Sequence, residues 1–255
     1  RMNILVANDD GIQARGIAEL AKALSKAGNV YVAAPNSQRS ASSHALSVND
    51  EITMKKIDFE GATMAFEVGG TPADCVKLAL YVLRDKGIDI DVVYAGINHG
   101  GNLGTDTMYS GTVSAAAEGL FNGLPAVAVS VNDHQASHFE GACRLALAVL
   151  PLVMEEGKNL GVVSINTPDI PADEIKGVKT ATLGKIKYHE WFNVVEENGD
   201  KVTYSYSGTP KNMDCWSDDT DAKLVRDGYA TISSVKYDQN DVEGNAIIEK
   251  WNLKI

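Results

Sequence analysis

The chain has 255 residues, of which 44% are hydrophobic and 22% charged, so it is long enough for one large domain with a sizeable core. Acidic residues outnumber basic ones by 34 to 23, and the net charge of −11 argues against polymeric nucleic acid as a partner, because such a surface repels a phosphate backbone. No apolar run approaches the roughly 18 residues of a membrane-spanning helix, so we expect no membrane partner.

Six short apolar runs predict buried strands, at 3–7, 30–34, 63–68, 91–95, 126–131 and 162–166. Four segments with apolar residues at helical spacing lie among them, at 17–27, 71–84, 112–122 and 138–156. This alternation favours an α/β fold with a mostly parallel sheet and helices on both faces. Ligands bind such sheets beyond the carboxyl ends of the strands, so the loops after Ala7, Ala34 and Ala95 are the expected site.

The last third has a different composition, with more aromatic and β-branched residues. Asn198-Gly199 separates two strand-like runs at 192–197 and 202–206 and is a strong hairpin signal. A short helix at 220–226 and a strand at 229–235 are expected to follow. We therefore predict a core over 1–185 and, over 186–255, a hairpin arm and C-terminal segment that pack on a second subunit.

Cysteine usage and the N-terminal residues bear on the compartment. Cys75, Cys143 and Cys215 are scattered and form no CxxC pair, so neither a disulfide framework nor a zinc site is expected. The first residues contain no basic stretch followed by an apolar segment and a cleavage site, so no signal peptide is expected. Both observations predict a cytoplasmic protein.

Two adjacent carboxylates, in Asn8-Asp9-Asp10-Gly11, follow the first predicted strand. They repel each other unless water solvates them or a cation neutralises both. Oxygen ligands of this kind suit hard cations such as Mg²⁺, Mn²⁺ or Ca²⁺. A solvated turn and a metal site explain the motif about equally well, so both interpretations stay open at this point.

The glycine-rich stretch 96–111 follows another predicted strand. The amide oxygen of Asn98 is expected to reach a metal held by Asp9 and Asp10, and the glycines allow a ligand to approach the backbone. Ser110-Gly111-Thr112 begins a helix, where hydroxyls and backbone amides form a phosphate cradle. An ordinary helix cap explains the same three residues, so this alternative also stays open.

Other signals are weak or absent. Arg39-Ser40, in a polar loop, offers a hydroxyl to a metal and a guanidinium to an anion, but alone it predicts little. The chain has no GxGxxG, no GxxxxGK[ST] and no GxSxG, which argues against a dinucleotide-binding domain, a P-loop NTPase and an α/β-hydrolase. His134 and His138 are better explained by a loop and a helix start than by a metal pair. His99 is expected to line the site rather than to bind metal.

Four sequence blocks resemble the survival protein E (SurE) family of nucleotidases and stand in family order. They are 2–16 (MNILVANDDGIQARG), 35–40, 70–78 (GTPADCVKL) and 96–119 (GINHGGNLGTDTMYSGTVSAAAEG). Weaker blocks at 164–168, 177–184 and 219–233 extend the resemblance over nearly the whole chain. Ala41 departs from the family pattern, which often has glycine there, and Ser233-Ser234-Val235 departs from a frequent Thr-Pro-Leu.

The resemblance implies a Rossmann-like three-layer α/β/α core with a hairpin and a C-terminal segment exchanged between subunits of a homodimer or homotetramer. It implies a metal-dependent phosphatase that hydrolyses nucleoside 5′- and 3′-monophosphates, with one divalent ion, Mg²⁺ or Mn²⁺, in each subunit. An exopolyphosphatase, a broader phosphatase of small phosphomonoesters and a non-catalytic nucleotide-binding protein are the alternatives.

The implied roles of single residues follow from the matching motifs. The family's metal ligands fall on Asp9, Asp10, Ser40 and Asn98. Asp9 and Asp10 are also the expected catalytic residues. The residues expected around the phosphate are Asn98, Ser110, Gly111 and Thr112.

Overall fold

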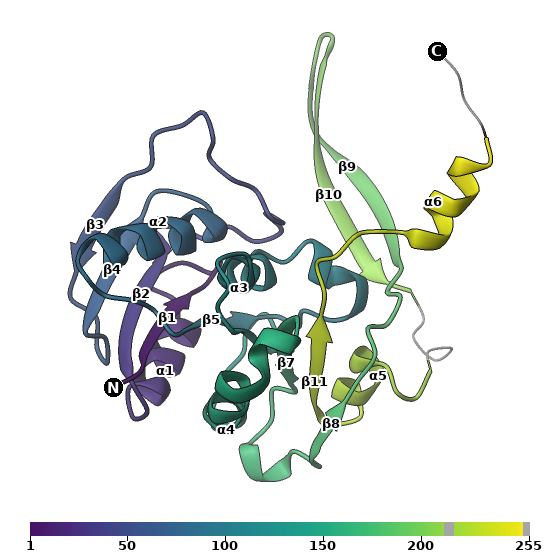
Figure 1. The fold of residues 1–255 in the computed structure, drawn as a ribbon. Helices are drawn as coiled ribbons and strands as arrows, with labels where there is room; N and C mark the ends of the chain where they lie inside the picture. Colours follow the sequence, from purple (N-terminus) through teal and green to yellow (C-terminus); the bar gives the residue numbers. More distant parts are fainter. Residues whose placement is uncertain (212–216, 252–255) are drawn as a thin grey trace.

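The computed structural model describes residues 1–211 and 217–251, so Cys215 lies outside the described residues (Figure 1). Within them, the main sheet contains β1 (Asn3–Ala7), β2 (Asn29–Pro35), β3 (Met54–Ile57), β4 (Met64–Val68), β5 (Val92–His99), β6 (Ala126–Val131), β7 (Val162–Thr167), β8 (Val178–Thr180) and β11 (Ala230–Val235). The helices are α1 (Arg15–Leu24), α2 (Pro72–Asp85), α3 (Gly111–Phe121), α4 (Glu140–Glu156), α5 (Asp221–Arg226) and α6 (Val242–Glu249). Short 3₁₀ helices are η1 (Gly104–Met108), η2 (Gly157–Asn159) and η3 (Ala172–Glu174).

The strands of the sheet follow the order β3-β4-β2-β1-β5-β6-β7-β11-β8. The six strands from β4 to β7 run parallel to one another. At the margins, β3 runs antiparallel to β4, and β11 runs antiparallel to β7. The predicted mostly parallel sheet is therefore confirmed. Two adjacent antiparallel strands can be joined by a short connection, whereas two adjacent parallel strands need a crossover segment between them.

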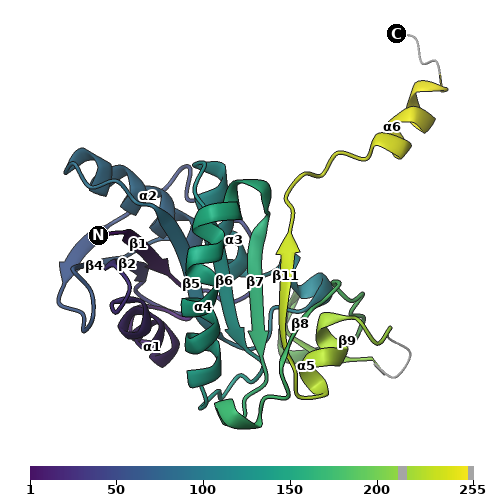
Figure 2. The ribbon, with the colours of Figure 1, turned by 60° about the horizontal axis from the view of Figure 1, so that its bottom comes forward.

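Helices cover both faces of the sheet, which gives three layers (Figure 2). Side chains alternate along a buried strand, so Ile4 and Val6 of β1 pack in the core cluster beneath α1 and α4. Leu5 and Ala7 of the same strand pack in the opposite cluster, beneath α2 and α3. The strands are buried on both sides, which explains why they appear in the sequence as continuous apolar runs.

Helix ends follow local signals in the sequence. Thr71 caps α2 by accepting a hydrogen bond from the Asp74 amide, and Asp74 accepts one from the Thr71 amide in return, as a capping box. The Ser110 hydroxyl caps α3 by accepting from the Val113 amide at 3.0 Å. Among the described residues, no helix is both long and apolar enough to cross a membrane.

The structure differs from the sequence prediction at β5. This strand continues through the first glycine-rich residues to His99, and its pairing with β6 shifts in register between Ala95 and Asn98. Asn98 therefore lies on a strand opposite Ser130, and not in a loop. The glycine content indicated a loop, but the pairing with β6 extends the strand.

A separate two-stranded hairpin, β9 (Tyr188–Asn198) and β10 (Lys201–Pro210), projects from the body, as does α6 (Figure 1). The expected hairpin around Asn198-Gly199 is thus present. Residues 186–255 are not all arm, because α5 packs on β11 and β11 pairs with β7 in the main sheet. Exchange of this segment between subunits stays a prediction.

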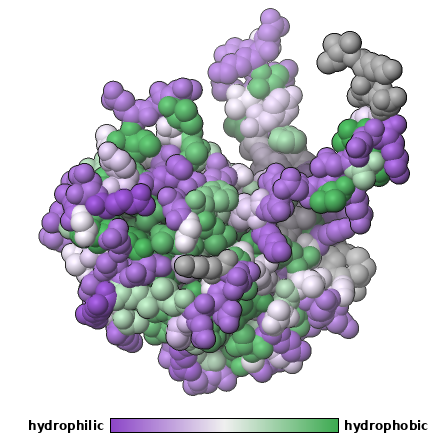
Figure 3. Space-filling model, in the orientation of Figure 1, coloured by the Kyte–Doolittle hydropathy of each residue, from purple (hydrophilic) through white to green (hydrophobic). Residues whose placement is uncertain are grey.

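The hairpin carries exposed apolar side chains below a hydrophilic tip (Figure 3). They include Trp191, Phe192, Val194, Val195 and Tyr204. An isolated two-stranded hairpin is marginally stable in water, so this surface favours a covering partner.

Candidate active site

A cavity of about 270 Å³ lies at the carboxyl ends of the central parallel strands. Asp9 from the end of β1, Ser40 from the loop after β2, Asn98 from β5 and Ser110 from the start of α3 all line it. These elements converge because parallel strands end at the same edge of the sheet. The fold thus brings together predicted residues that are as many as 101 positions apart, from Asp9 to Ser110.

Asp9 is held in a tight turn after β1. The Asn8 side chain donates to the Gly11 carbonyl at 2.9 Å and accepts from the Gly11 amide at 3.2 Å, and Gly11 takes a φ of +100° that favours glycine. Asp9 is only 4% exposed. The Thr112 hydroxyl donates to Asp9 Oδ1 at 2.5 Å.

The environment of Asp9 opposes a negative charge. Burial raises its pKa to about 6, and the adjacent charge of Asp10 adds to this, whereas the hydrogen bond from Thr112 lowers it. In the described residues, no Lys or Arg forms an ion pair with either aspartate. A bound cation would compensate both carboxylates.

Asp10 is fixed by His99. Its Oδ2 accepts from the His99 backbone amide at 2.9 Å and lies 2.9 Å from His99 Nδ1. The hydrogen bond to Asp10 raises the pKa of His99, while burial acts against it. The His99 ring packs edge-on against Phe139 with ring centroids 5.3 Å apart. His99 therefore sets the rotamer of a predicted ligand.

Asn98 lines the cavity, and its side-chain amide is held by one hydrogen bond. Its Nδ2 donates to the Gly100 carbonyl at 2.8 Å, and this hydrogen bond fixes which end of the amide is the nitrogen. The oxygen is left as the group that can bind a cation or accept from a ligand.

Ser40 lies in an exposed loop that is attached to the core on both sides. The Arg39 amide donates to the Asp9 carbonyl at 2.7 Å, and the Ser40 hydroxyl accepts from Gln38 Nε2 at 2.9 Å. Further along, His44 Nε2 lies 2.7 Å from the buried Glu118 carboxylate, which also binds Lys77 at 3.2 Å. The loop is therefore anchored on α3.

Ala41 and Ser42 are unusual positions in this loop. Ala41 has a φ of +54°, in the left-handed region that disfavours any residue with a Cβ. This accounts physically for the glycine expected there from the family pattern. The Ser42 hydroxyl lies next to Gly111 and is buried. It has no hydrogen-bond partner among the described residues.

Besides Asn98, the three residues expected around a phosphate at the start of α3 differ in their surroundings. Ser110 lines the cavity while its oxygen caps α3. A Cβ on Gly111 would lie 2.8 Å from Asp9 Cβ, so only glycine lets α3 approach Asp9 this closely. Thr112 is fully buried and donates its hydroxyl to Asp9. This hydrogen bond holds the Asp9 carboxylate in place. A role of Thr112 in phosphate binding stays a prediction.

The donor set suits a hard cation. Among the described residues, no three His, Cys, Asp or Glu side chains are grouped as a metal centre, so nitrogen or sulfur ligation of the zinc type is not offered. Of the predicted ligands, one carboxylate, one amide oxygen and one hydroxyl line the cavity. Together with the adjacent Asp10 carboxylate, whose Oδ2 binds His99, they fit Mg²⁺ or Mn²⁺, which keep water in their remaining positions. The residues present therefore fit the divalent ion that the sequence predicts.

The histidine pair has no common site. His134 lines the cavity beside Gly100, whereas His138 lies by Asp169 with Nδ1 3.2 Å from Oδ1. These positions agree with the interpretation of the two histidines as a loop residue and a residue near a helix start. Asp106 and Tyr109 also line the cavity; they lie in the glycine-rich stretch expected at the site, although neither was given a role there.

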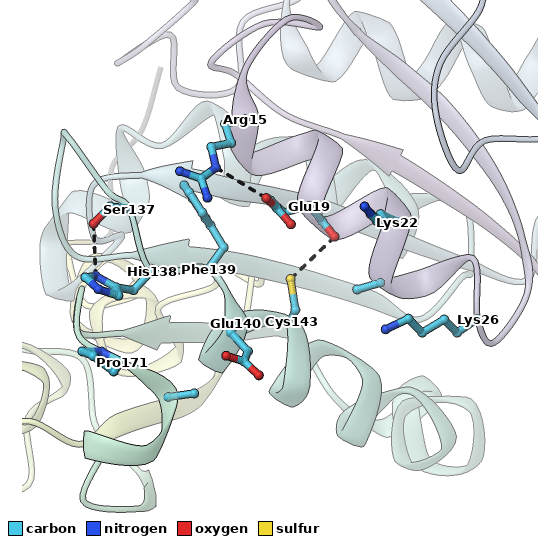
Figure 4. A pocket seen from close by; sticks show the side chains of 12 residues that line it. Arg15, Glu19, Lys22, Lys26, Ser137, His138, Phe139, Glu140, Cys143 and Pro171 are labelled. Atoms are coloured by element: carbon cyan, nitrogen blue, oxygen red, sulfur yellow. Dashed lines mark hydrogen bonds and ion pairs between the residues drawn. The ribbon is translucent and has the colours of Figure 1, made fainter.

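A different cavity of about 420 Å³ lies between α1 and the start of α4 (Figure 4). Some of its polar groups pair with one another, and others pair with residues outside it. Arg15 Nε lies 3.4 Å from Glu19 Oε1, and the Cys143 thiol donates to the Glu19 carbonyl at 3.6 Å. Burial raises the pKa of Cys143 to about 12, so the thiol stays protonated at neutral pH. None of the predicted ligands lines this cavity.

Comparison with known proteins places this geometry in context. The family model described as "Survival protein SurE" matches residues 4–190. The 5′-nucleotidase SurE of Desulforudis audaxviator (strain MP104C) is 39% identical over 252 residues, which cover 98% of this chain and 97% of that protein. The 5′-nucleotidase SurE of Petrotoga mobilis (strain DSM 10674 / SJ95) is 39% identical over 93% of this chain and 96% of its own length.

The same comparison extends to solved structures. The crystal structure of the SurE protein from Aquifex aeolicus superimposes with a TM-score of 0.83 at 31% identity. The match covers 98% of this chain and 100% of that chain, so the agreement includes the sheet, the helices that cover it and the C-terminal third.

Proposed function

Because this chain belongs to the survival protein SurE family, we propose that it is a 5′-nucleotidase, a phosphoric monoester hydrolase that converts nucleoside 5′-monophosphates to nucleoside and inorganic phosphate. The observation that supports this most is the single cavity lined by Asp9, Ser40, Asn98 and Ser110. Family likeness suggests the reaction, and the oxygen-rich site is suited to it.

The proposed cofactor is one divalent ion per subunit, Mg²⁺ or Mn²⁺, with Asp9, Asp10, Ser40 and Asn98 as the residues that would hold it. When bound, such an ion lowers the pKa of a water ligand and offsets charge on the phosphoryl oxygens. His99 keeps Asp10 in position through two contacts at 2.9 Å, and the Gly100 carbonyl keeps the Asn98 amide oriented.

The chain's own residues account for the remaining steps. In hydrolysis, a water oxygen bonds to phosphorus, the bond from phosphorus to the nucleoside oxygen breaks, and that oxygen takes up a proton. We assign the proton of the attacking water to Asp9 Oδ2, the oxygen that does not bind the Thr112 hydroxyl. Backbone amides at a helix N-terminus favour anions, so Ser110 and Gly111 at the start of α3 are the proposed phosphate contacts.

Further parts of the proposal concern substrate range and assembly. We propose that the chain also hydrolyses nucleoside 3′-monophosphates, that it is cytoplasmic, and that it forms a homodimer or homotetramer. The exposed apolar side chains on β9 and β10 support a subunit interface that includes the arm of residues 186–255. No polymeric nucleic acid is expected as substrate, because the net charge is −11.

The experiment is a panel of substrates with Mn²⁺ and with Mg²⁺: 5′- and 3′-nucleoside monophosphates, ribose 5-phosphate and polyphosphate. We expect steady turnover of the 5′-monophosphates with the highest kcat/KM. Preferred hydrolysis of polyphosphate or of the sugar phosphate would favour the alternative phosphatases. Binding of nucleotide without turnover would make the chain a non-catalytic nucleotide-binding protein.

A further inference from the structure

A larger cavity, of about 800 Å³, lies between the core and the base of the hairpin. It shares Ala41, Asp106, Tyr109 and His134 with the cavity that Asp9 lines. The two cavities therefore adjoin at these residues. The larger cavity is therefore the space next to a phosphate ester bound beside Asp9 and Ser110.

Tyr109 forms one wall of this cavity. Its backbone is fixed on both sides, because the Tyr109 amide donates to the Asp106 carbonyl at 3.0 Å and the Tyr109 carbonyl accepts from the Ser43 amide at 3.0 Å. Tyr109 is nevertheless 64% exposed. A large aromatic ring held open on a rigid backbone is a surface for stacking.

The opposite wall comes from the hairpin. Alternate residues of a strand share a face, so Tyr188 and Glu190 of β9 lie on the same side as Tyr206 of β10, which pairs with Phe192. The Tyr188 hydroxyl donates to Asp106 Oδ2 at 2.5 Å, and the Tyr206 hydroxyl donates to Glu190 Oε1 at 2.9 Å. This wall is aromatic, with carboxylates at its edge.

The base of the hairpin is attached to the loop that carries Tyr109. The Thr105 hydroxyl donates to the Ile186 carbonyl at 2.9 Å. The buried Asp221 carboxylate accepts from the Gly104 amide at 2.7 Å and from the Gly184 amide at 3.0 Å. The two walls are thus joined by hydrogen bonds at the base of the hairpin.

We infer that this cavity binds the nucleoside of the substrate, with its base stacked on Tyr109 and facing Tyr188 and Tyr206 of the hairpin. The inference rests on the proposed function and adds the position of the leaving group to it. Asp106 and Glu190 each keep one carboxylate oxygen outside the tyrosine hydrogen bonds, so the edge of the cavity accepts hydrogen bonds. Amino groups of the base and ribose hydroxyls are the complementary donors.

The test compares substrates that share the phosphate but differ in the base. Steady-state kcat/KM is measured for AMP, GMP and ribose 5-phosphate with the metal-loaded protein. Loss of one base-stacking ring is expected to lower kcat/KM for a nucleotide at least about tenfold, mainly through KM. In Tyr109→Ala we therefore expect the ratio of AMP to ribose 5-phosphate to fall at least about tenfold. Tyr109→Phe keeps the ring and is expected to keep the ratio.

Matched tyrosines provide the controls. Tyr81→Ala removes an exposed ring on α2, away from both cavities, and Tyr204→Ala removes one further along the hairpin that lines neither of them. Both are expected to keep the ratio. A second readout is inhibition by adenosine, whose inhibition constant is expected to rise in Tyr109→Ala only.

The outcomes separate this inference from the proposed function. An unchanged ratio and an unchanged adenosine inhibition constant in Tyr109→Ala would overturn the base site while nucleotide hydrolysis stands. A ratio that falls equally in Tyr204→Ala would also overturn it, because that residue lies outside the cavity. A wild-type protein that hydrolyses none of the nucleotides would overturn the proposed function itself.

Discussion

The Thr112 hydroxyl donates a hydrogen bond to Asp9 Oδ1 at 2.5 Å, although the two residues lie 103 positions apart. Both side chains are buried, and the contact joins the first turn of α3 to the end of β1. It fixes one oxygen of the aspartate, so that the other keeps a defined orientation beside the cavity. Thr112 is therefore a positioning residue for Asp9.

Replacement of Thr112 tests that relationship. Thr112→Val keeps the shape but removes the donor, so we expect the nucleotidase kcat to fall at least about tenfold, because charged hydrogen bonds contribute roughly 1.5–3 kcal/mol. Thr112→Ser keeps the hydroxyl and is expected to retain most of the activity. Circular dichroism of both variants checks that α3 is intact. Equal activities of the two variants would show that the hydrogen bond has no such role.

The pKa of Asp9 leads to a prediction about stability in the metal-free protein. The folded-state pKa of about 6 exceeds the usual value of 3.8, so the folded protein binds the proton more tightly, and this contribution to stability is lost as pH rises from about 4 to about 6. Asp9→Asn removes the buried charge. At pH 7 the metal-free variant should be more stable than the wild type by up to about 3 kcal/mol, from 1.36 kcal/mol per unit of pKa.

Urea unfolding at pH 4 and pH 7 in the presence of a chelator measures this difference. We expect the gain from Asp9→Asn to be small at pH 4 and large at pH 7, while the variant loses nucleotidase activity. Asp173→Asn replaces an exposed aspartate and is a suitable control. A gain that is the same at both pH values would contradict the assignment of the pH dependence to Asp9.

Ala41 provides a prediction on backbone strain. Its φ of +54° costs a residue with a Cβ roughly 1–2 kcal/mol, whereas glycine adopts this region readily. Ala41→Gly should therefore raise the free energy of unfolding by about 1 kcal/mol, after the greater entropy of glycine in the unfolded chain is subtracted. Ala45→Gly, in the same loop but without a positive φ, should give no gain. Equal effects of the two substitutions would contradict the strain at Ala41.

The hairpin leads to a prediction on assembly. Phe192 and Val194 are exposed on one face of β9, and a closed twofold contact is the commonest way to cover such a surface. Sedimentation equilibrium should give a mass of at least twice 27.2 kDa for the wild type. Phe192→Glu combined with Val194→Glu should shift it toward monomer, whereas Glu196→Gln near the tip should not. A wild-type monomer at micromolar concentration would contradict the proposed interface.

Much of the fold was predictable because it depends on local signals. Continuous apolar runs gave the buried strands, and Thr71, Pro72 and Asp74 predicted the start of α2, which the capping box confirms. The glycines after Ala95 misled the prediction for β5, since pairing with β6 extends that strand to His99. Pairing of this kind comes from tertiary contacts and overrides local propensity.

The site was predictable in part for the same reason. The position of Asp9, Asp10 and Asn98 after buried strands indicated that they would converge. The contacts of Thr112 with Asp9 and of Tyr188 with Asp106 join segments about 80 to 100 residues apart, and no spacing in a single sequence encodes them. The lining role of His134 depends likewise on its approach to Gly100 in the folded chain.

The most direct test of the account is the metal dependence of AMP hydrolysis. The protein is treated with EDTA and desalted, and release of inorganic phosphate from AMP is measured before and after Mn²⁺ or Mg²⁺ is added. We predict that chelation abolishes turnover and that either ion restores it in the wild type. In Asp10→Asn the restored rate should be at least about 10²-fold lower, because a charged ligand is lost. Full activity of the metal-free wild type, or undiminished activity of Asp10→Asn, would contradict the proposed metal site at Asp9 and Asp10.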